Sequence, residues 1–166
     1  MAWTAWPERD LRTVNLAGGP DFTPGELLRE PEIGVSALAA GARGDVLLVW
    51  SLSEWQRSGY LRAAVQRPGG AFSPPVLLGR DAGTKQAVLG ADGGGAVLFS
   101  TGKIDRPRPV LRFLRPDGSW SEQRPAADIA ALTPAGPGRY TVATVAFKGT
   151  ARSNRFTLGV KEIGAS

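Results

Sequence analysis

The sequence of 166 residues contains neither cysteine nor histidine. Without cysteine it cannot form disulfides, thiolate nucleophiles or cysteine-based zinc sites. Without histidine it lacks the commonest general base, the serine–histidine triads and the commonest nitrogen ligand for metals. No metal site and no cofactor are therefore expected, and most familiar enzyme chemistries are excluded.

Long apolar runs are missing as well. The first residues (MAWTAWP) lack the charged start and the apolar stretch of a signal peptide, and no segment reaches the length that spans a membrane. A membrane is therefore not expected as a partner. Cysteine usage is the usual clue to the redox environment of a protein. Because this sequence has no cysteine, it assigns no compartment.

What the sequence does have is many residues that interrupt helices. It contains 22 glycines and 13 prolines, and 42% of its residues are apolar, which is enough for a substantial core. Breakers at this frequency leave no room for long helices. The composition predicts an all-β fold of short strands joined by turns.

The net charge of +5 is unevenly distributed. Residues 1–34 carry three arginines against six acids, whereas residues 101–166 carry eleven lysines and arginines against five acids. Sixteen arginines against four lysines are explained by a GC-rich genome as well as by an anion-binding surface. A nucleic acid is therefore not expected as a partner.

Two sequence patterns recur in the same order at a spacing of 44 to 50 residues, which is typical of stacked or radial repeats. Residues 44–51 (GDVLLVWS) align with 94–101 at a shift of 50 and with 138–144 at a further 44, and residues 67–73 (RPGGAFS) align with 115–121 (RPDGSWS) at a shift of 48. Each repeat then holds four short antiparallel strands, A to D. In the two full repeats these strands are predicted at 35–41, 45–52, 60–66 and 72–78, and at 86–91, 96–101, 110–114 and 120–123.

The chain is expected to begin and end with partial repeats. We predict one partial propeller over residues 1–166, with repeat boundaries at 1–30 (strands B to D), 33–80, 85–127 and 128–166 (strands A to C). In the last repeat, strands B and C are predicted at 140–147 and 155–162.

Strand 45–52 is apolar at the consecutive positions 46–50. Because alternate residues of a strand point to opposite faces, both faces of its sheet must be covered. Radially packed blades provide this cover. We therefore predict propeller-type blades of four antiparallel strands, about three and a half in number and open unless assembled, with a two-sheet β-sandwich as the alternative.

The turns at 68–73 and 116–121 share the pattern Pro-x-Gly-x-aromatic-Ser. They resemble the bacterial β-propeller repeats related to the sialidase-type Asp-box (BNR) family, whose box has the form Ser-x-Asp-x-Gly-x-Thr-Trp. The segment 117–120 (DGSW) lacks one spacer and the leading serine, so the activity of that family is not carried over. The resemblance implies that the turn aims an aromatic into the interface between blades, which would make core residues of Phe22, Phe72 and Trp120.

The B-to-C loops, at 7–10, 51–59, 101–109 and 148–154, differ between repeats, and variable loops on a fixed scaffold commonly carry recognition. The candidate ligand-binding residues in two of them are Glu54, Trp55, Arg57, Lys103, Asp105 and Arg106. Trp55 would stack on a sugar or anchor a protein partner, or else fold back over its blade. The integrin-type tripeptide 43–45 (RGD) is interpreted as a tight turn that takes Gly and Asp for backbone reasons.

We therefore predict a non-enzymatic β-propeller-type binding or assembly module that recognises a glycan or a protein through its B-to-C loops, with no catalytic residues. The alternative is half of a glycoside-processing, sialidase-like propeller completed by a second chain, which would use a tyrosine nucleophile. Tyr60 and Tyr140 are the only tyrosines. Because closed propellers have about four to eight blades, we expect a homodimer or another chain to complete the ring.

Replacing Trp55 by Ala is expected to weaken binding of a glycan or protein ligand by about 2 kcal/mol, because a tryptophan at a loop tip acts as an anchor. The melting temperature should stay nearly unchanged. Titration calorimetry and a thermal melt on the same sample measure both quantities. Intact binding with a lowered melting temperature would place Trp55 in the core.

Overall fold

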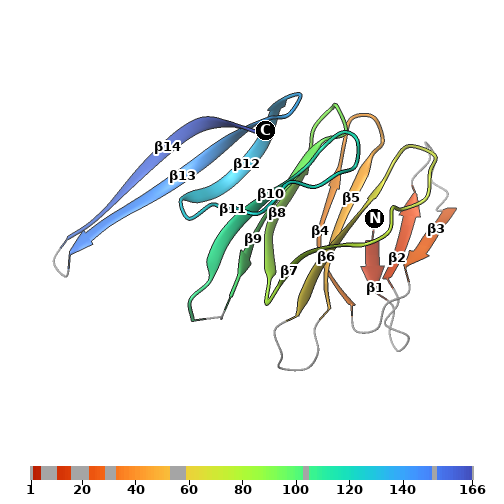
Figure 1. Ribbon diagram of the computed structural model, residues 1–166, viewed down its shortest axis with the longest axis horizontal. Helices are drawn as coiled ribbons and strands as arrows, with labels where there is room; N and C mark the ends of the chain where they lie inside the picture. The colour runs from red at the N-terminus through yellow and green to blue at the C-terminus, as the bar shows by residue number, and fades with distance from the viewer. Residues whose placement is uncertain are drawn as a thin grey trace.

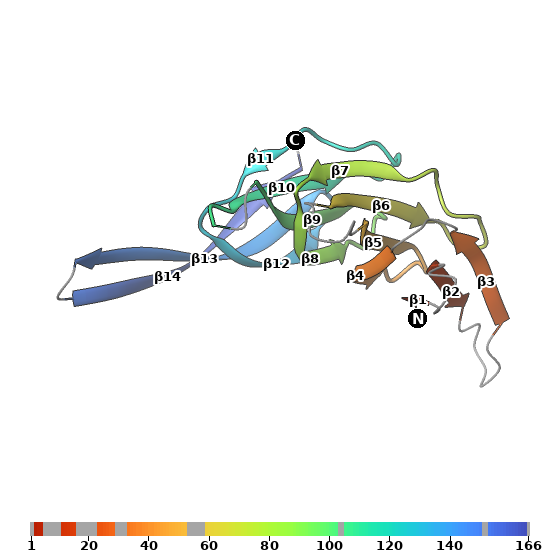
Figure 2. The same ribbon diagram turned by 90° about the horizontal axis from the view of Figure 1, so that it is seen from below.

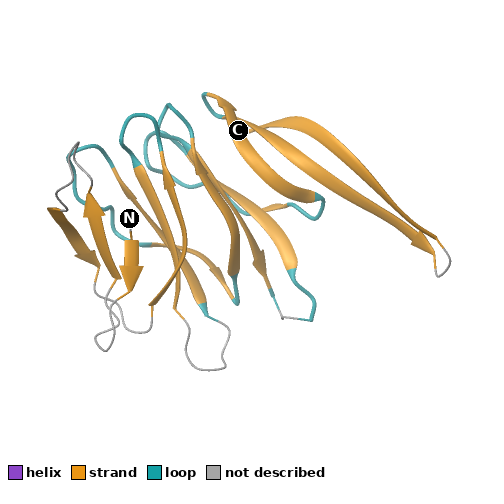
Figure 3. Ribbon diagram, turned by 180° about the vertical axis from the view of Figure 1, so that it is seen from behind, coloured by secondary structure: helices purple, strands orange, loops and turns teal. Residues whose placement is uncertain are grey.

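The computed structural model describes residues 2–4, 11–15, 23–28, 33–52, 59–102, 105–150 and 153–165. As Figure 3 shows, these residues form strands, loops and turns, and none of them is in a helix. No helix long and apolar enough to cross a bilayer is present in these ranges. The all-β prediction is confirmed.

The strands form four antiparallel sheets in chain order. The first sheet contains β1 (Ala2–Thr4), β2 (Leu11–Asn15) and β3 (Thr23–Leu28). The second contains β4 (Ile33–Ala40), β5 (Val46–Leu52), β6 (Tyr60–Gln66) and β7 (Val76–Arg80). The third contains β8 (Gly83–Leu89), β9 (Gly95–Thr101), β10 (Arg108–Leu114) and β11 (Arg124–Pro125). The fourth contains β12 (Ile129–Gly136), β13 (Arg139–Thr150) and β14 (Ser153–Gly164).

The four sheets stand side by side in a row, with the first and the fourth at its two ends (Figure 1). Neighbouring sheets meet along their first strands: β1 lies beside β4, β4 beside β8, and β8 beside β12. Each sheet is therefore a layer whose faces look toward its neighbours in the row.

The central strands of the second and third sheets are buried on both faces. Residues 47–50 of β5 and residues 96–99 of β9 have no exposed surface. Within β9 the side chains alternate: Val97 and Phe99 belong to the core between the second and third sheets, whereas Ala96 and Leu98 belong to the core between the third and fourth. The prediction that these strands are covered on both sides is confirmed, and each large apolar side chain buried there contributes about 1.5–3 kcal/mol.

The glycine at the A-to-B turn fixes the true repeat spacing. Gly44, Gly93 and Gly138 all have a positive φ, of 87°, 80° and 61°, a conformation that side chains rarely adopt. With the strand registers on either side, they give spacings of 49 (44 to 93) and 45 (93 to 138) residues. The predicted shifts of 50 and 44 are each wrong by one, because the glycine run 93–95 fits either alignment, and such a slip exchanges the two faces of a strand.

The turn after the third strand repeats at the predicted spacing of 48 residues. Ser121 N–H donates to the carbonyl of Phe113 at 2.8 Å, and Ser121 Oγ accepts the N–H of Phe113 at 2.9 Å. Ser73 makes the same two bonds with Val65, at 2.8 and 3.1 Å. The recurring serine therefore closes the turn by satisfying a backbone group that the strand ladder leaves unpaired.

The aromatic residue before each serine has the predicted core position. Phe72 is buried, and Trp120 is partly buried against the core between the second and third sheets. The Arg112 guanidinium lies 5.8 Å from the centre of the Trp120 ring, and its burial lowers the pKa of Arg112. Phe22 lies outside the described residues.

Three predicted boundaries are wrong, those of the two fourth strands and of one loop. Phe72 and Trp120 form only isolated bridges, and the fourth strands start later, at residues 76 and 124, since Pro74 and Pro75 have no N–H for the first of these ladders. The loop predicted at 148–154 is largely strand, because β13 continues to 150 and β14 starts at 153. Its polar composition favours a loop, but antiparallel pairing satisfies the same backbone groups.

Replacing Ser121 by Ala should destabilise the protein by about 1–3 kcal/mol, because the buried N–H of Phe113 loses its acceptor. Urea unfolding followed by tryptophan fluorescence measures this change. Ser119→Ala, in the same turn but exposed, is the control and should change stability by less than about 0.5 kcal/mol. Equal effects of the two substitutions would show that the serine does not close the turn.

Candidate functional site

Most of the predicted ligand-binding residues cannot be placed. Glu54, Trp55, Arg57 and Lys103 lie outside the described residues, whereas Asp105 and Arg106 lie exposed in the connection between β9 and β10. The B-to-C loop rim therefore remains a prediction.

The two tyrosines have different surroundings. Tyr60 begins β6 and is 38% exposed, with the Arg80 guanidinium 5.4 Å from its ring centre. Tyr140 is buried, with its ring centre 5.3 Å from that of Phe113. Burial, with a smaller effect of the Asp92 carboxylate, raises the pKa of Tyr140 to about 12. The Tyr140 hydroxyl therefore stays protonated, and its ring packs in the core. A buried, protonated hydroxyl does not suit a nucleophile.

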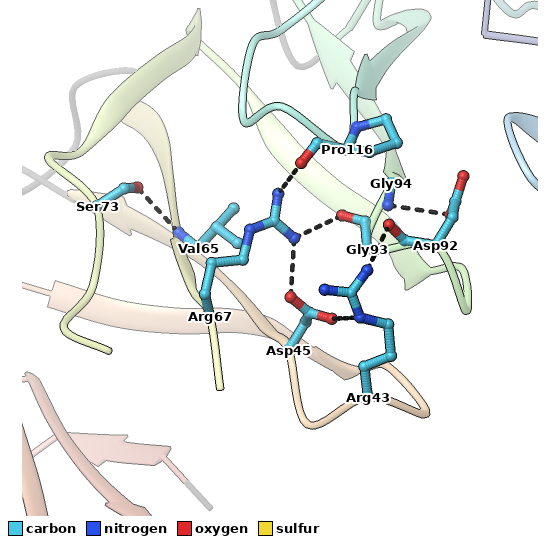
Figure 4. Close-up of polar contacts among 9 residues, drawn as sticks. All are labelled: Arg43, Asp45, Val65, Arg67, Ser73, Asp92, Gly93, Gly94 and Pro116. Atoms are coloured by element: carbon cyan, nitrogen blue, oxygen red, sulfur yellow. Dashed lines mark hydrogen bonds and ion pairs between the residues drawn. The ribbon is translucent and has the colours of Figure 1, made fainter. Parts of the chain in front are cut away.

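At the opposite end of the sheets, polar side chains connect the second sheet to the third (Figure 4). Arg67 is central. Its Nη1 donates to Asp45 Oδ1 at 2.9 Å and to the carbonyl of Gly93 at 2.8 Å, and its Nη2 donates to the carbonyl of Pro116 at 2.9 Å. Gly93 and Pro116 belong to two different turns of the third sheet. One guanidinium therefore holds a carboxylate of its own sheet and two turns of the next.

Asp45 is the buried partner in this joint. Its side chain has no exposed surface, and its Oδ2 atom lies 3.8 Å from Arg43 Nε without accepting a hydrogen bond among the described residues. Arg43 also donates to the carbonyl of Asp92 at 3.3 Å. Because the carboxylate is enclosed between the sheets, the tripeptide 43–45 cannot present it to an adhesion receptor. The interpretation of that tripeptide as a structural turn is confirmed.

A related contact joins the third sheet to the fourth. Asp92 Oδ1 accepts the N–H of Gly94 at 3.1 Å, and Asp92 Oδ2 accepts the N–H of Gly138 at 3.1 Å. Gly138 lies in the turn between β12 and β13. The glycine turns at this end therefore dock onto one another from sheet to sheet, as expected for a structural rim.

The outer face of the fourth sheet, defined by Ala143, Val145, Leu158 and Val160, is different. Leu158 is 80% exposed and Val160 is 77% exposed, the highest values among the exposed large apolar side chains of the described residues. Val145 pairs with Leu158 and Ala143 with Val160, so the four side chains share one face. The other face of this sheet carries Tyr140 and Val142 and packs on the third sheet.

The fourth sheet also extends beyond its neighbours. β12 pairs with β13 only as far as Thr144, so residues 145–150 and 153–158 form a two-stranded ribbon. Figure 2 shows this hairpin projecting from the row of sheets. A two-stranded ribbon is marginally stable in water, so this part of the chain gains most from further cover.

Among the described residues, no three carboxylates come close enough together to hold a metal ion. No protein-family model matches the chain, and the search of curated proteins finds no match. The resemblance to Asp-box repeats therefore remains a prediction. The residues of the outer face were not predicted from the sequence, although the alternation of Phe156, Leu158 and Val160 indicates an apolar face on that strand.

Replacing Arg67 by Met should destabilise the protein by about 3 kcal/mol, because it leaves the buried Asp45 carboxylate with only the long ion pair to Arg43. Denaturant unfolding measures the loss. Arg43→Met is the control, since its ion pair is long and its side chain exposed, and should cost less than about 1 kcal/mol.

A second variant keeps this test decisive. Combining Arg67→Met with Asp45→Asn removes the buried charge and should recover part of the lost stability. If the double variant is less stable by the sum of the two single effects, Asp45 and Arg67 do not act as a pair.

Proposed function

We propose that this chain is a non-enzymatic assembly and binding module of the β-propeller type. The observation that carries the proposal is the exposure of Leu158 and Val160 on the outer face of the fourth sheet. Apolar faces of this kind on soluble proteins mark sites of association. The face is therefore assigned to taking up a further β-sheet.

The repeat supports this assignment, because it shows what happens to the same positions in the other sheets. From the registers, Leu158 corresponds to Leu61 of the second sheet, and Val160 corresponds to Ala63 of the second and Leu111 of the third. These three residues are 0%, 0% and 2% exposed, and in each case the following sheet covers them. The outer face of the fourth sheet thus repeats a surface that a following sheet covers twice at the Val160 position and once at the Leu158 position.

The arrangement of the sheets favours a propeller over a sandwich. A sandwich needs two layers, whereas here four consecutive sheets adjoin through their first strands, and the third is enclosed between two others. Closed propellers have about four to eight such units around a centre. Further sheets would continue the row at its exposed end.

Recognition of a glycan or protein through the B-to-C loops is the binding half of the proposal. Asp105 and Arg106 are exposed, and the exposed Tyr60 with its stacked Arg80 borders the 53–58 loop. An aromatic ring beside charged groups suits a sugar or a polar protein surface. Glu54, Trp55, Arg57 and Lys103 complete the proposed rim.

We expect the chain to self-associate at micromolar concentration, with a mass by light scattering above the 17.5 kDa of one chain. Leu158→Asp should weaken the association by about 2 kcal/mol, or about 30-fold in Kd, because it places a charge on the apolar face. Thr157→Asp is the matched control, since Thr157 is exposed on the same strand but on the opposite face. A folded wild-type monomer, or equal effects of the two substitutions, would contradict the proposal.

A further inference from the structure

We infer that the sheet covering this outer face is the first sheet of a second copy of the chain, so that the two copies join head to tail. The inference rests on the proposed assembly function and adds the identity and orientation of the partner. It follows from three observations: the direction in which the sheets cover one another, the register of the first sheet, and the charge of the two ends.

The second and third sheets, and the third and fourth, cover one another in the same direction. The face of β6 that carries Leu61 and Ala63 meets the face of the third sheet that carries Phe99 and Val110. The face of β10 that carries Leu111 meets the corresponding face of the fourth sheet. In both pairs, the face of one sheet that looks toward the C-terminal end of the row packs on the face of the next sheet that looks toward the N-terminal end. The outer face of the fourth sheet looks toward the C-terminal end of the row. Its partner should therefore be a face of the kind that looks toward the N-terminal end.

The first sheet has the register that such a partner requires. Its cross-strand row is Trp3, Arg12 and Leu27, and the row at the same place in the second sheet is Trp50, Arg62 and Leu77. The row of the second sheet lies on the face that looks toward the first sheet. By the same repeat, the row of the first sheet belongs to the face that no other sheet covers among the described residues.

The charges of the two ends are complementary. Residues 1–34 carry three arginines against six acids, whereas residues 129–166 carry five lysines and arginines against one acid. Arg139 is 62% exposed at the border of the outer face, where it pairs loosely with Glu162 at 3.7 Å. In the repeat, Arg139 of the fourth sheet corresponds to Asp45 of the second sheet. There, Arg67, which pairs with Asp45, donates a hydrogen bond to the third sheet.

This charge pattern also decides between two ways of pairing two copies. Packing the outer face of one copy on the same face of another would bring two basic segments together, which costs energy. Packing it on the N-terminal sheet brings a basic segment to an acidic one. Each copy supplies four sheets, so two copies related by a two-fold axis would close a ring of eight, within the range of propellers.

Engineered cysteines test the inference, because the native chain has none. Val160→Cys marks the outer face and Arg12→Cys marks the first sheet. Their equivalents in the second and third sheets, Ala63 and Val110, lie in one common core, so a short bis-maleimide should span the two positions. The two single variants are mixed in urea, refolded together and treated with the cross-linker, and each is treated alone as a control.

The inference predicts a covalent dimer in the mixture and several-fold less of it in either variant alone. Cross-linking of Val160→Cys alone, as efficient as in the mixture, would overturn the inference in favour of face-to-face pairing while leaving the proposed function standing. Self-association that Leu158→Asp disrupts, without cross-linking in the mixture, would also overturn it. A wild-type chain that stays monomeric in light scattering would instead overturn the proposed function itself.

Discussion

The burial of both faces of the inner sheets is the constraint on which the rest of this structure depends. β9 contributes alternate side chains to two separate cores, so neither neighbour of the third sheet can be removed without exposing a row of apolar groups. Backbone pairing holds each sheet together internally, but it provides nothing between sheets. Hydrophobic contact supplies that attraction, and it makes every sheet depend on the next.

Hydrophobic attraction has no direction, so the alignment of neighbouring sheets needs polar contacts. Arg67 supplies these between the second and third sheets. Between the third and fourth, the Gln86 side chain donates to the carbonyl of Leu132 at 2.8 Å and accepts its N–H at 2.9 Å. These side chains bond to backbone groups of the next sheet, so they set the position of its strands rather than of a single side chain.

The row of sheets has two ends, and the hydrophobic attraction that holds the inner sheets together also acts on the sheets at these ends. Terminal layers of repeat proteins are commonly capped by polar residues on their outer face. The fourth sheet instead presents Leu158 and Val160 to solvent, with the loosely paired Arg139 and Glu162 at its border. Its outer face therefore has the apolar character of the faces that are covered in the inner sheets.

Local patterns were sufficient for much of the fold. The frequency of Gly and Pro indicates an all-β chain, the run 46–50 indicates a strand covered on both faces, and the paired serines at 73 and 121 indicate recurring turns, because each pattern depends on residues close together in the chain. The repeat spacing could not be set to the residue from sequence, since the glycines at 93–95 are interchangeable until strand pairing selects one for positive φ.

Contacts between distant segments had to come from the tertiary structure. The pairing of Asp45 with Arg67, and the docking of Arg67 onto the turns at 93 and 116, depend on how two sheets are stacked, which no local pattern records. The contrast between Leu61 and Leu158 has the same origin. Both are leucines at one position of the same repeat, but Leu61 lies under the third sheet, whereas Leu158 lies in the projecting ribbon and no sheet among the described residues covers it.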